Sequence, residues 1–157
     1  MKAILDARPR YIRFAQSILN NLQDAEDVVQ DCYIRLYERN DEQEIRNREA
    51  YMMQAVRNAC LDLLKKKRPE ELEDRHEQLS AAQADVLRKM ESQEHARRLQ
   101  QLIRLLPEKQ RTAFYLRDVE GYEMNEIETV TGLSNEAIRS ALCRARKQLR
   151  DLYNQLK

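Results

Sequence analysis

Residues 124–147 read MNEIETVTGLSNEAIRSALCRARK, and this stretch has the pattern of a helix-turn-helix. A first helical segment ends at Gly132, a residue type that adopts a left-handed backbone without steric penalty, and Ser134 can then cap a second helix. The apolar positions expected to form the core shared by the two helices are Ile127, Val130, Leu133, Ile138 and Leu142. The second helix also carries a row of basic side chains, namely Arg139, Arg144, Arg146, Lys147 and Arg150. Such a helix suits the major groove of DNA, although a hairpin in an ordinary helical bundle would show a similar pattern.

The composition favours an all-α protein. Only 2 of the 157 residues are glycine and 3 are proline, 35% are charged, and apolar residues recur at helical spacing almost throughout. The three cysteines, Cys32, Cys60 and Cys143, lie among apolar positions without a Cys-x-x-Cys pair, so we expect them to be small core residues. His76 and His95 stand alone, so neither a metal site nor a cofactor is expected. The sequence has neither a secretory signal nor an apolar run of membrane-spanning length, which favours a reducing cytoplasm.

Three helices are expected before residue 69. The first covers about residues 7–22, and the second begins with a cap at Asp24 and ends near Asn40. The third helix follows a polar loop at residues 41–48 and ends in the basic run 65–68. Because Pro69 disfavours helix at the residue before it, the domain boundary is placed there.

The second half of the chain is expected to contain four helices. Periodicity resumes at Val86, and Pro107 is well placed to begin the helix that Gly121 closes. We therefore predict two small helical domains, residues 1–68 and 85–157, joined by a flexible acidic linker at residues 69–84.

The net charge of +1 averages over an uneven distribution. Residues 1–68 contain 13 basic and 11 acidic side chains, residues 69–94 contain 3 and 8, and residues 95–157 contain 12 and 8. Two mildly basic ends that flank an acidic middle suit two modules that touch a polyanion. The composition of the linker also permits the two modules to pack against each other in the free protein.

Two separated segments resemble one protein family. The sequence DAEDVVQDCYIRLY at residues 24–37 is similar to the region 2 helix of bacterial sigma factors, where an Ala-Glu-Asp-apolar-apolar-Gln-acidic core is typical. The sequence LPEKQRTAF at residues 106–114, followed by Glu120-Gly121 and by IRSALCRAR at residues 138–146, resembles region 4 of the same family. The order of the two segments and the short linker resemble the extracytoplasmic-function (ECF) type of the sigma-70 class.

This resemblance implies a transcription initiation factor that acts as a monomer and is not an enzyme. Such a factor binds bacterial core RNA polymerase, directs it to promoter DNA and helps to melt the minus-ten region. Members of the family are commonly held by an anti-sigma factor, which the sequence itself does not identify. In the family the acidic region 2 helix docks on a coiled-coil clamp of the polymerase, and Asp27, Gln30 and Asp31 occupy the matching positions. Residues at i, i+3 and i+4 share a helix face, so these three side chains are expected to point together.

The third helix matches the family segment that meets the minus-ten element. Its entry, NREAY at residues 47–51, resembles the family's Asn-Pro-Arg-Ala-Trp, with Arg48 in place of the proline. By this resemblance Arg46, Asn47 and Arg48 are candidates for the pocket that holds an extruded base. The further candidates are expected near one helical face, where they could contact phosphates and base edges: Arg57, Asn58, Asp62 and Lys65.

The second helix of the helix-turn-helix is expected to enter the minus-thirty-five major groove. Its base-facing candidates are Asn135, Glu136, Arg139 and Ser140, while Arg144 and Arg146 are expected to hold phosphates. Three positions depart from the family pattern: Glu128 stands where alanine is favoured, Thr131 where leucine is favoured, and Ala141 where arginine is frequent. Leucines 99, 102 and 106 could engage the polymerase flap by resemblance, but core packing is the expectation from their spacing.

Two other classes of function remain open from the sequence. A dimeric helix-turn-helix regulator would use the same DNA-binding hairpin without joining RNA polymerase. A structural helical adaptor would use the basic stretches only as solubilising surface. An enzyme is disfavoured, because the sequence has no Ser-His-Asp arrangement, clustered metal ligands or Gly-rich phosphate loop.

Overall fold

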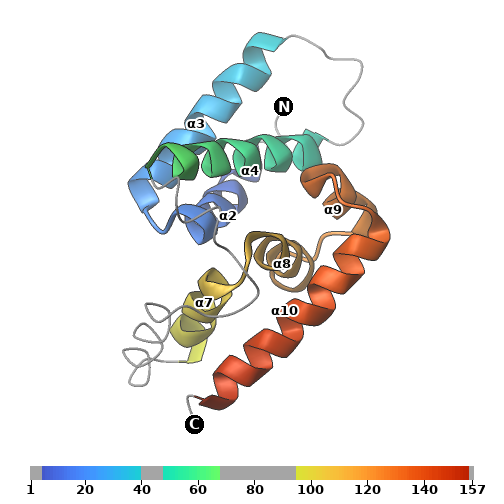
Figure 1. Ribbon diagram of the computed structural model, residues 1–157. Coiled ribbons are helices and arrows are strands. Elements are labelled where there is room, and N and C mark those ends of the chain that lie inside the picture. Colours follow the sequence, from blue (N-terminus) through green and yellow to red (C-terminus); the bar gives the residue numbers. More distant parts are fainter. Residues whose placement is uncertain (1–4, 40–47, 68–94, 156–157) are drawn as a thin grey trace.

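The computed structural model describes residues 5–39, 48–67 and 95–155, and every regular element within these ranges is helical (Figure 1). The all-α prediction is thereby confirmed. Several sequence predictions, including the roles of Arg46 and Asn47 and the linker at residues 69–84, concern positions outside the described ranges. Among the described helices, none is long and apolar enough to cross a membrane.

The N-terminal half contains three helices, α2 (Arg8–Leu19), α3 (Leu22–Arg39) and α4 (Arg48–Lys67). Helix α2 ends because Asn20 adopts a left-handed backbone with φ of 54° and donates its N–H to the carbonyl of Gln16. The first turn of α3 is capped by Asn21, whose Oδ1 accepts the backbone N–H of Asp24 at 2.9 Å. The prediction that Asp24 itself is the cap is therefore wrong, because the helix begins three residues earlier than expected.

The C-terminal half contains α7 (His95–Leu105), α8 (Glu108–Phe114), a π-helical turn η1 (Tyr115–Val119), α9 (Met124–Thr131) and α10 (Asn135–Gln155). As expected, Pro107 precedes α8, because its fixed φ suits a helix start. In η1 the N–H of Glu120 donates to the carbonyl of Tyr115 at 3.0 Å, a bond across five residues. Gly121 follows with φ of 74° and turns the chain into α9.

One apolar cluster joins the two halves of the chain. It contains buried residues of α2, α3 and α4, such as Phe14, Val29 and Val56, together with Leu116 and Ile127 from the C-terminal half. A second, smaller cluster lies between α7 and α10. Figure 1 shows α9 at one end of α4, and α8 between the N-terminal helices and α10.

Cysteine burial follows the expectation at two positions of three. Cys32 and Cys60 are buried, whereas Cys143 is exposed. The prediction for Cys143 is wrong because α10 turns the neighbouring residues Ala141, Leu142 and Ala145 toward the core and leaves residue 143 outside that stripe. Of the three leucines expected to pack in the core, Leu102 and Leu106 are buried, whereas Leu99 is 42% exposed.

Candidate nucleic-acid interface

The helix-turn-helix is built as the sequence predicts. Gly132 ends α9 with φ of 73°, and its N–H donates to the carbonyl of Glu128 at 2.8 Å. Ser134 then caps α10, because its Oγ accepts the N–H of Ala137 at 3.2 Å. The predicted core residues Ile127, Val130, Ile138 and Leu142 are buried, and Leu133 packs against them. The hydrogen bonds therefore fix the turn between α9 and α10, and the shared core fixes how the two helices cross.

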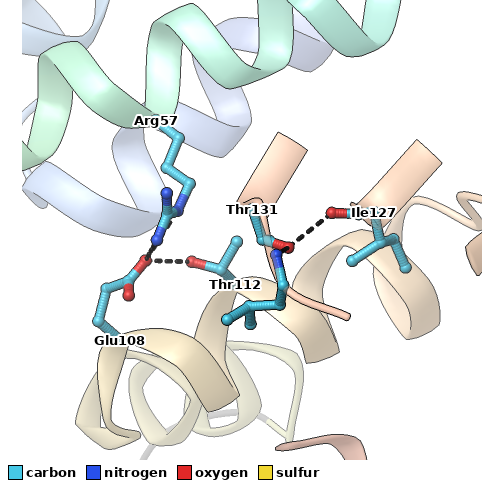
Figure 2. A network of polar contacts seen from close by, with 6 residues as sticks. Arg57, Glu108, Thr112, Ile127 and Thr131 are labelled. Carbon is cyan, nitrogen blue, oxygen red and sulfur yellow. Dashed lines mark hydrogen bonds and ion pairs between the residues drawn. The ribbon is translucent and has the colours of Figure 1, made fainter. Parts of the chain in front are cut away.

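Thr131 explains one departure from the family pattern. Its Oγ1 donates to the carbonyl of Ile127 at 2.7 Å and accepts the N–H of Leu133 at 3.1 Å, so the hydroxyl bridges the two sides of the turn (Figure 2). Ala141 is only 7% exposed, so a small side chain fits its place in the core. Glu128 is half-buried, and its neighbours Ile127 and Val130 are fully buried. The larger side chain at position 128 therefore does not expose the apolar residues beside it.

The predicted base-facing residues lie together at the beginning of α10. Glu136, Arg139 and Ser140 are exposed, and Asn135 is half-buried. The Nε of Arg139 donates to Oδ1 of Asn135 at 2.6 Å, which orients the guanidinium along the helix face. Arg144 and Arg146 are also exposed one to two turns further along. This arrangement presents hydrogen-bonding groups first and cations beyond them, as a recognition helix requires.

Arg146 of α10 forms an ion pair with Asp118 of η1. Its Nε and Nη2 donate to the two carboxylate oxygens of Asp118, both at 2.9 Å. The hydrogen bond to Asp118 raises the pKa of Arg146. The sequence pattern gave no indication of this pair, because the two residues are 28 positions apart.

The third-helix candidates do not all share one surface. Asn58, Asp62 and Lys65 are exposed, and the first two line a hollow of about 370 Å³ between α3 and α4, beside Arg35. Arg57 departs from this group, because it is directed toward α8 and its side chain is only 14% exposed. The expected common face therefore holds for three of the four residues. Arg48 begins α4 and is half-buried.

The acidic face of α3 is formed as predicted. Asp27, Gln30 and Asp31 are all exposed, and the helical spacing places them on one side. Gln23 supports this face, because its Nε2 donates to Oδ1 of Asp27 at 3.0 Å. Within the described part of the chain, there is no group of three or more His, Cys, Asp or Glu side chains that could hold a metal ion.

Two family models match this chain in the order of its two halves. The model described as "Sigma-70 region 2" matches residues 4–70, and the one described as "Sigma-70, region 4" matches residues 96–149. The chain belongs to the sigma-70 family. The second match contains the helix-turn-helix, and the first contains the acidic face of α3 and the whole of α4.

Curated relatives place this sigma-70 family member with the ECF type. It is 28% identical over 145 residues to the ECF RNA polymerase sigma factor SigE of Mycolicibacterium smegmatis, covering 90% of this chain but 56% of SigE. It is 27% identical over 150 residues to SigW of Bacillus subtilis, covering 86% of this chain and 80% of SigW. The chain thus spans little more than half the length of SigE.

Solved structures share the fold. The sigma factor RpoE of Bartonella quintana, crystallised with the anti-sigma factor NepR, matches with a TM-score of 0.73 at 22% identity, over 98% of this chain and 95% of that one. The ECF sigma factor SigJ of Mycobacterium tuberculosis matches with a TM-score of 0.59 at 26% identity, over 95% of this chain and 53% of SigJ. These matches confirm the predicted sigma-factor fold.

Proposed function

We propose that this protein is a transcription initiation factor that binds bacterial core RNA polymerase, directs it to specific promoters and helps to melt the minus-ten region. In this proposal residues 1–68 form the polymerase and minus-ten domain, residues 69–84 the linker, and residues 85–157 the minus-thirty-five domain. The observation that carries the proposal is the presence, on one chain, of an exposed acidic face on α3 and an exposed recognition face at the start of α10. A DNA-binding regulator would need only the second.

The binding of core polymerase is assigned to the acidic face of α3. Two carboxylates and an amide at Asp27, Gln30 and Asp31 are exposed together and can accept and donate hydrogen bonds to a basic, polar partner surface. Because these groups are exposed, they support a docking role better than a structural one.

Promoter contacts are assigned to both halves. The minus-ten candidates remain Arg46, Asn47, Arg48, Arg57, Asn58, Asp62 and Lys65. The minus-thirty-five candidates are Asn135, Glu136, Arg139, Ser140, Arg144 and Arg146. Melting requires no catalytic group, because capture of unpaired bases offsets the few kcal/mol that each unstacked base costs. The protein thus acts by binding alone.

The proposed compartment is the cytoplasm, where polymerase and chromosome are found. The proposed active form is a monomer bound to the polymerase. An anti-sigma factor is a further proposed partner. It is supported by the fold shared with RpoE, which was crystallised with NepR.

A run-off transcription assay tests the proposal. Purified protein is added to bacterial core RNA polymerase on a library of fragments from the source genome, and the transcripts are mapped. We expect discrete starts that require both components. Co-purification with core at low salt is the companion measurement, because a dimeric regulator would bind DNA but not core. Failure to bind core, or the absence of any specific transcript with active core, would reject the proposal.

A further inference from the structure

A hollow of about 380 Å³ lies between α2, α7 and η1, and none of the residues that line it belongs to the predicted promoter or polymerase sites. The apolar part of its wall is formed by Leu99, Ile103, Tyr115 and Val119. The charged part is formed by Arg13 and Arg104, and no Asp or Glu is among the described residues that line the hollow. Cavities of this size bind small molecules through apolar walls and a few polar groups.

Two apolar side chains in the hollow are open to water. Leu99 is 42% exposed and Val119 is 49% exposed, whereas Ile103 on the same wall is 4% exposed. Leu99 belongs to α7 and Val119 is the last residue of η1, so the exposed apolar surface comes from two separate elements that face one hollow. This convergence distinguishes the pair from single apolar residues scattered over a surface, which need no explanation.

Arg104 is a half-buried cation in the same hollow. It lies in the last turn of α7, where a cation suits the helix dipole, but the dipole does not require burial. Burial lowers the pKa of Arg104, and within the described ranges no carboxylate forms an ion pair with it. Because a guanidinium removed from water is stabilised by an anion that accepts its N–H donors, an anionic group is the natural partner for this side chain.

Arg13 of α2 adds a second cation at the rim of the hollow. Its side chain is 58% exposed, and its Nε lies 3.5 Å from Oε1 of Glu120, so the guanidinium is only partly engaged. Two hydroxyls on the wall already donate elsewhere, Ser17 to the carbonyl of Phe14 at 2.6 Å and Tyr115 to Glu120 at 3.1 Å. The remaining hydrogen-bonding capacity is dominated by guanidinium donors, which select an acceptor such as a carboxylate over a donor such as an amine.

We propose that this hollow is a binding site for a free fatty carboxylate, whose acid group pairs with Arg104 and whose alkyl chain covers Leu99 and Val119. The ligand has one negative head and one apolar tail, as the two parts of the wall require. Each methylene that leaves water at the apolar wall tightens binding about fourfold. The proposal is independent of the proposed function, since it uses no residue assigned to polymerase or to promoter DNA.

Isothermal titration calorimetry of the full chain with decanoate, kept below the concentration at which it forms micelles, tests the site. Decanol is the matched ligand, because it has the same tail without the charge. We expect wild type to bind decanoate about tenfold more tightly than decanol, the size of a hydrogen bond to a charged group. Octanoate, which is two methylenes shorter, should bind about tenfold more weakly than decanoate. Decanoate should also raise the thermal midpoint of unfolding.

Two variants separate the head of the ligand from its tail. Arg104→Met removes the charge and keeps an apolar stem, so it should abolish the preference for decanoate over decanol. Val119→Asp places a carboxylate where the tail lies, so it should weaken the binding of both ligands. The matched controls are Arg97→Met, at an exposed arginine of α7, and Leu22→Asp, at an exposed leucine of α3, and both should bind as wild type does. Circular dichroism checks that helix content is unchanged.

Equal affinities of wild type for decanoate and decanol would overturn the proposal, as would a preference for decanoate that survives Arg104→Met. Failure of wild type to bind decanoate would do the same, and this result does not depend on the folding of any variant. Sedimentation of the protein with phosphatidylglycerol vesicles, without binding of decanoate, would assign the cations and the apolar residues to a membrane surface and would also reject the site.

Discussion

Arg146 of α10 and Asp118 of η1 form a two-bond ion pair on the surface, with both hydrogen bonds at 2.9 Å. The side chains are 50% and 28% exposed, so the pair contributes no more than about 1 kcal/mol to stability. Because Arg146 is assigned to a phosphate, Asp118 competes with DNA for it.

Asp118→Asn is therefore expected to increase affinity for duplex DNA by about two- to fivefold, the equivalent of about 0.4–1 kcal/mol. The gain should be the same on cognate and scrambled duplexes, because a phosphate contact carries no sequence information. Anisotropy titrations at several salt concentrations measure it, with Asp151→Asn as the equal-charge control. A gain confined to the cognate duplex would show that Arg146 reads a base instead.

Arg139 is expected to contribute sequence specificity. It is exposed near the start of α10 and oriented by Asn135, so Arg139→Ala should weaken minus-thirty-five binding by about 1–3 kcal/mol if it reads a base. Binding to a scrambled duplex should change much less. Asn135→Ala should reproduce part of the loss, because the guanidinium loses its 2.6 Å acceptor. A similar loss on both duplexes would assign Arg139 to the backbone of DNA.

Asp31 is expected to contact core polymerase. Asp31→Lys reverses an exposed charge on the acidic face of α3, so it should weaken core binding while the helix content remains that of wild type. Glu38→Lys, a reversal at another exposed position of the same helix, is the matched control. If the affinity for core is unchanged by Asp31→Lys, that residue does not belong to the docking surface.

Local signals explain which features the sequence predicted correctly. Helical periodicity, Pro107 before α8, and Gly132 with Ser134 at the turn all act within a few residues, so the helices and the helix-turn-helix follow from them. The sequence predicts the cap of α3 three residues too late, because Asn21 and Asp24 are both good capping types.

Tertiary contacts explain the rest. Arg57 and Glu108 are 51 residues apart, and no local pattern links a basic residue on α4 with an acidic one that also fits a helix start. The sequence permitted closed packing of the two halves but could not identify these partners. It therefore assigned Arg57 to the same face as Asn58, whereas the structure turns Arg57 toward α8.

Gly132 should be sensitive to substitution for a backbone reason alone. Its φ is 73°, and a Cβ added there would meet no atom within 4 Å, so steric contact does not contribute. Gly132→Ala should lower the free energy of unfolding by about 1–2 kcal/mol, because a left-handed backbone is unfavourable for alanine. Urea unfolding followed by circular dichroism measures it. Gly132→Asn should lower the free energy of unfolding by less than Gly132→Ala, since asparagine tolerates a left-handed backbone. Equal decreases for the two variants would show that the backbone conformation is not the reason for the loss of stability.

The three cysteines should differ in reactivity. Burial raises the pKa of Cys32 to about 11 and also raises that of Cys60, whereas Cys143 is exposed on α10. Because the thiolate is the reacting species, a disulfide reagent at pH 8 should modify one thiol rapidly in the native protein and three in urea. Cys143→Ser should abolish the rapid phase and leave the slow labelling unchanged. Rapid modification of either remaining thiol in that variant would mean that Cys32 or Cys60 is accessible, and would contradict the packing of α3 against α4.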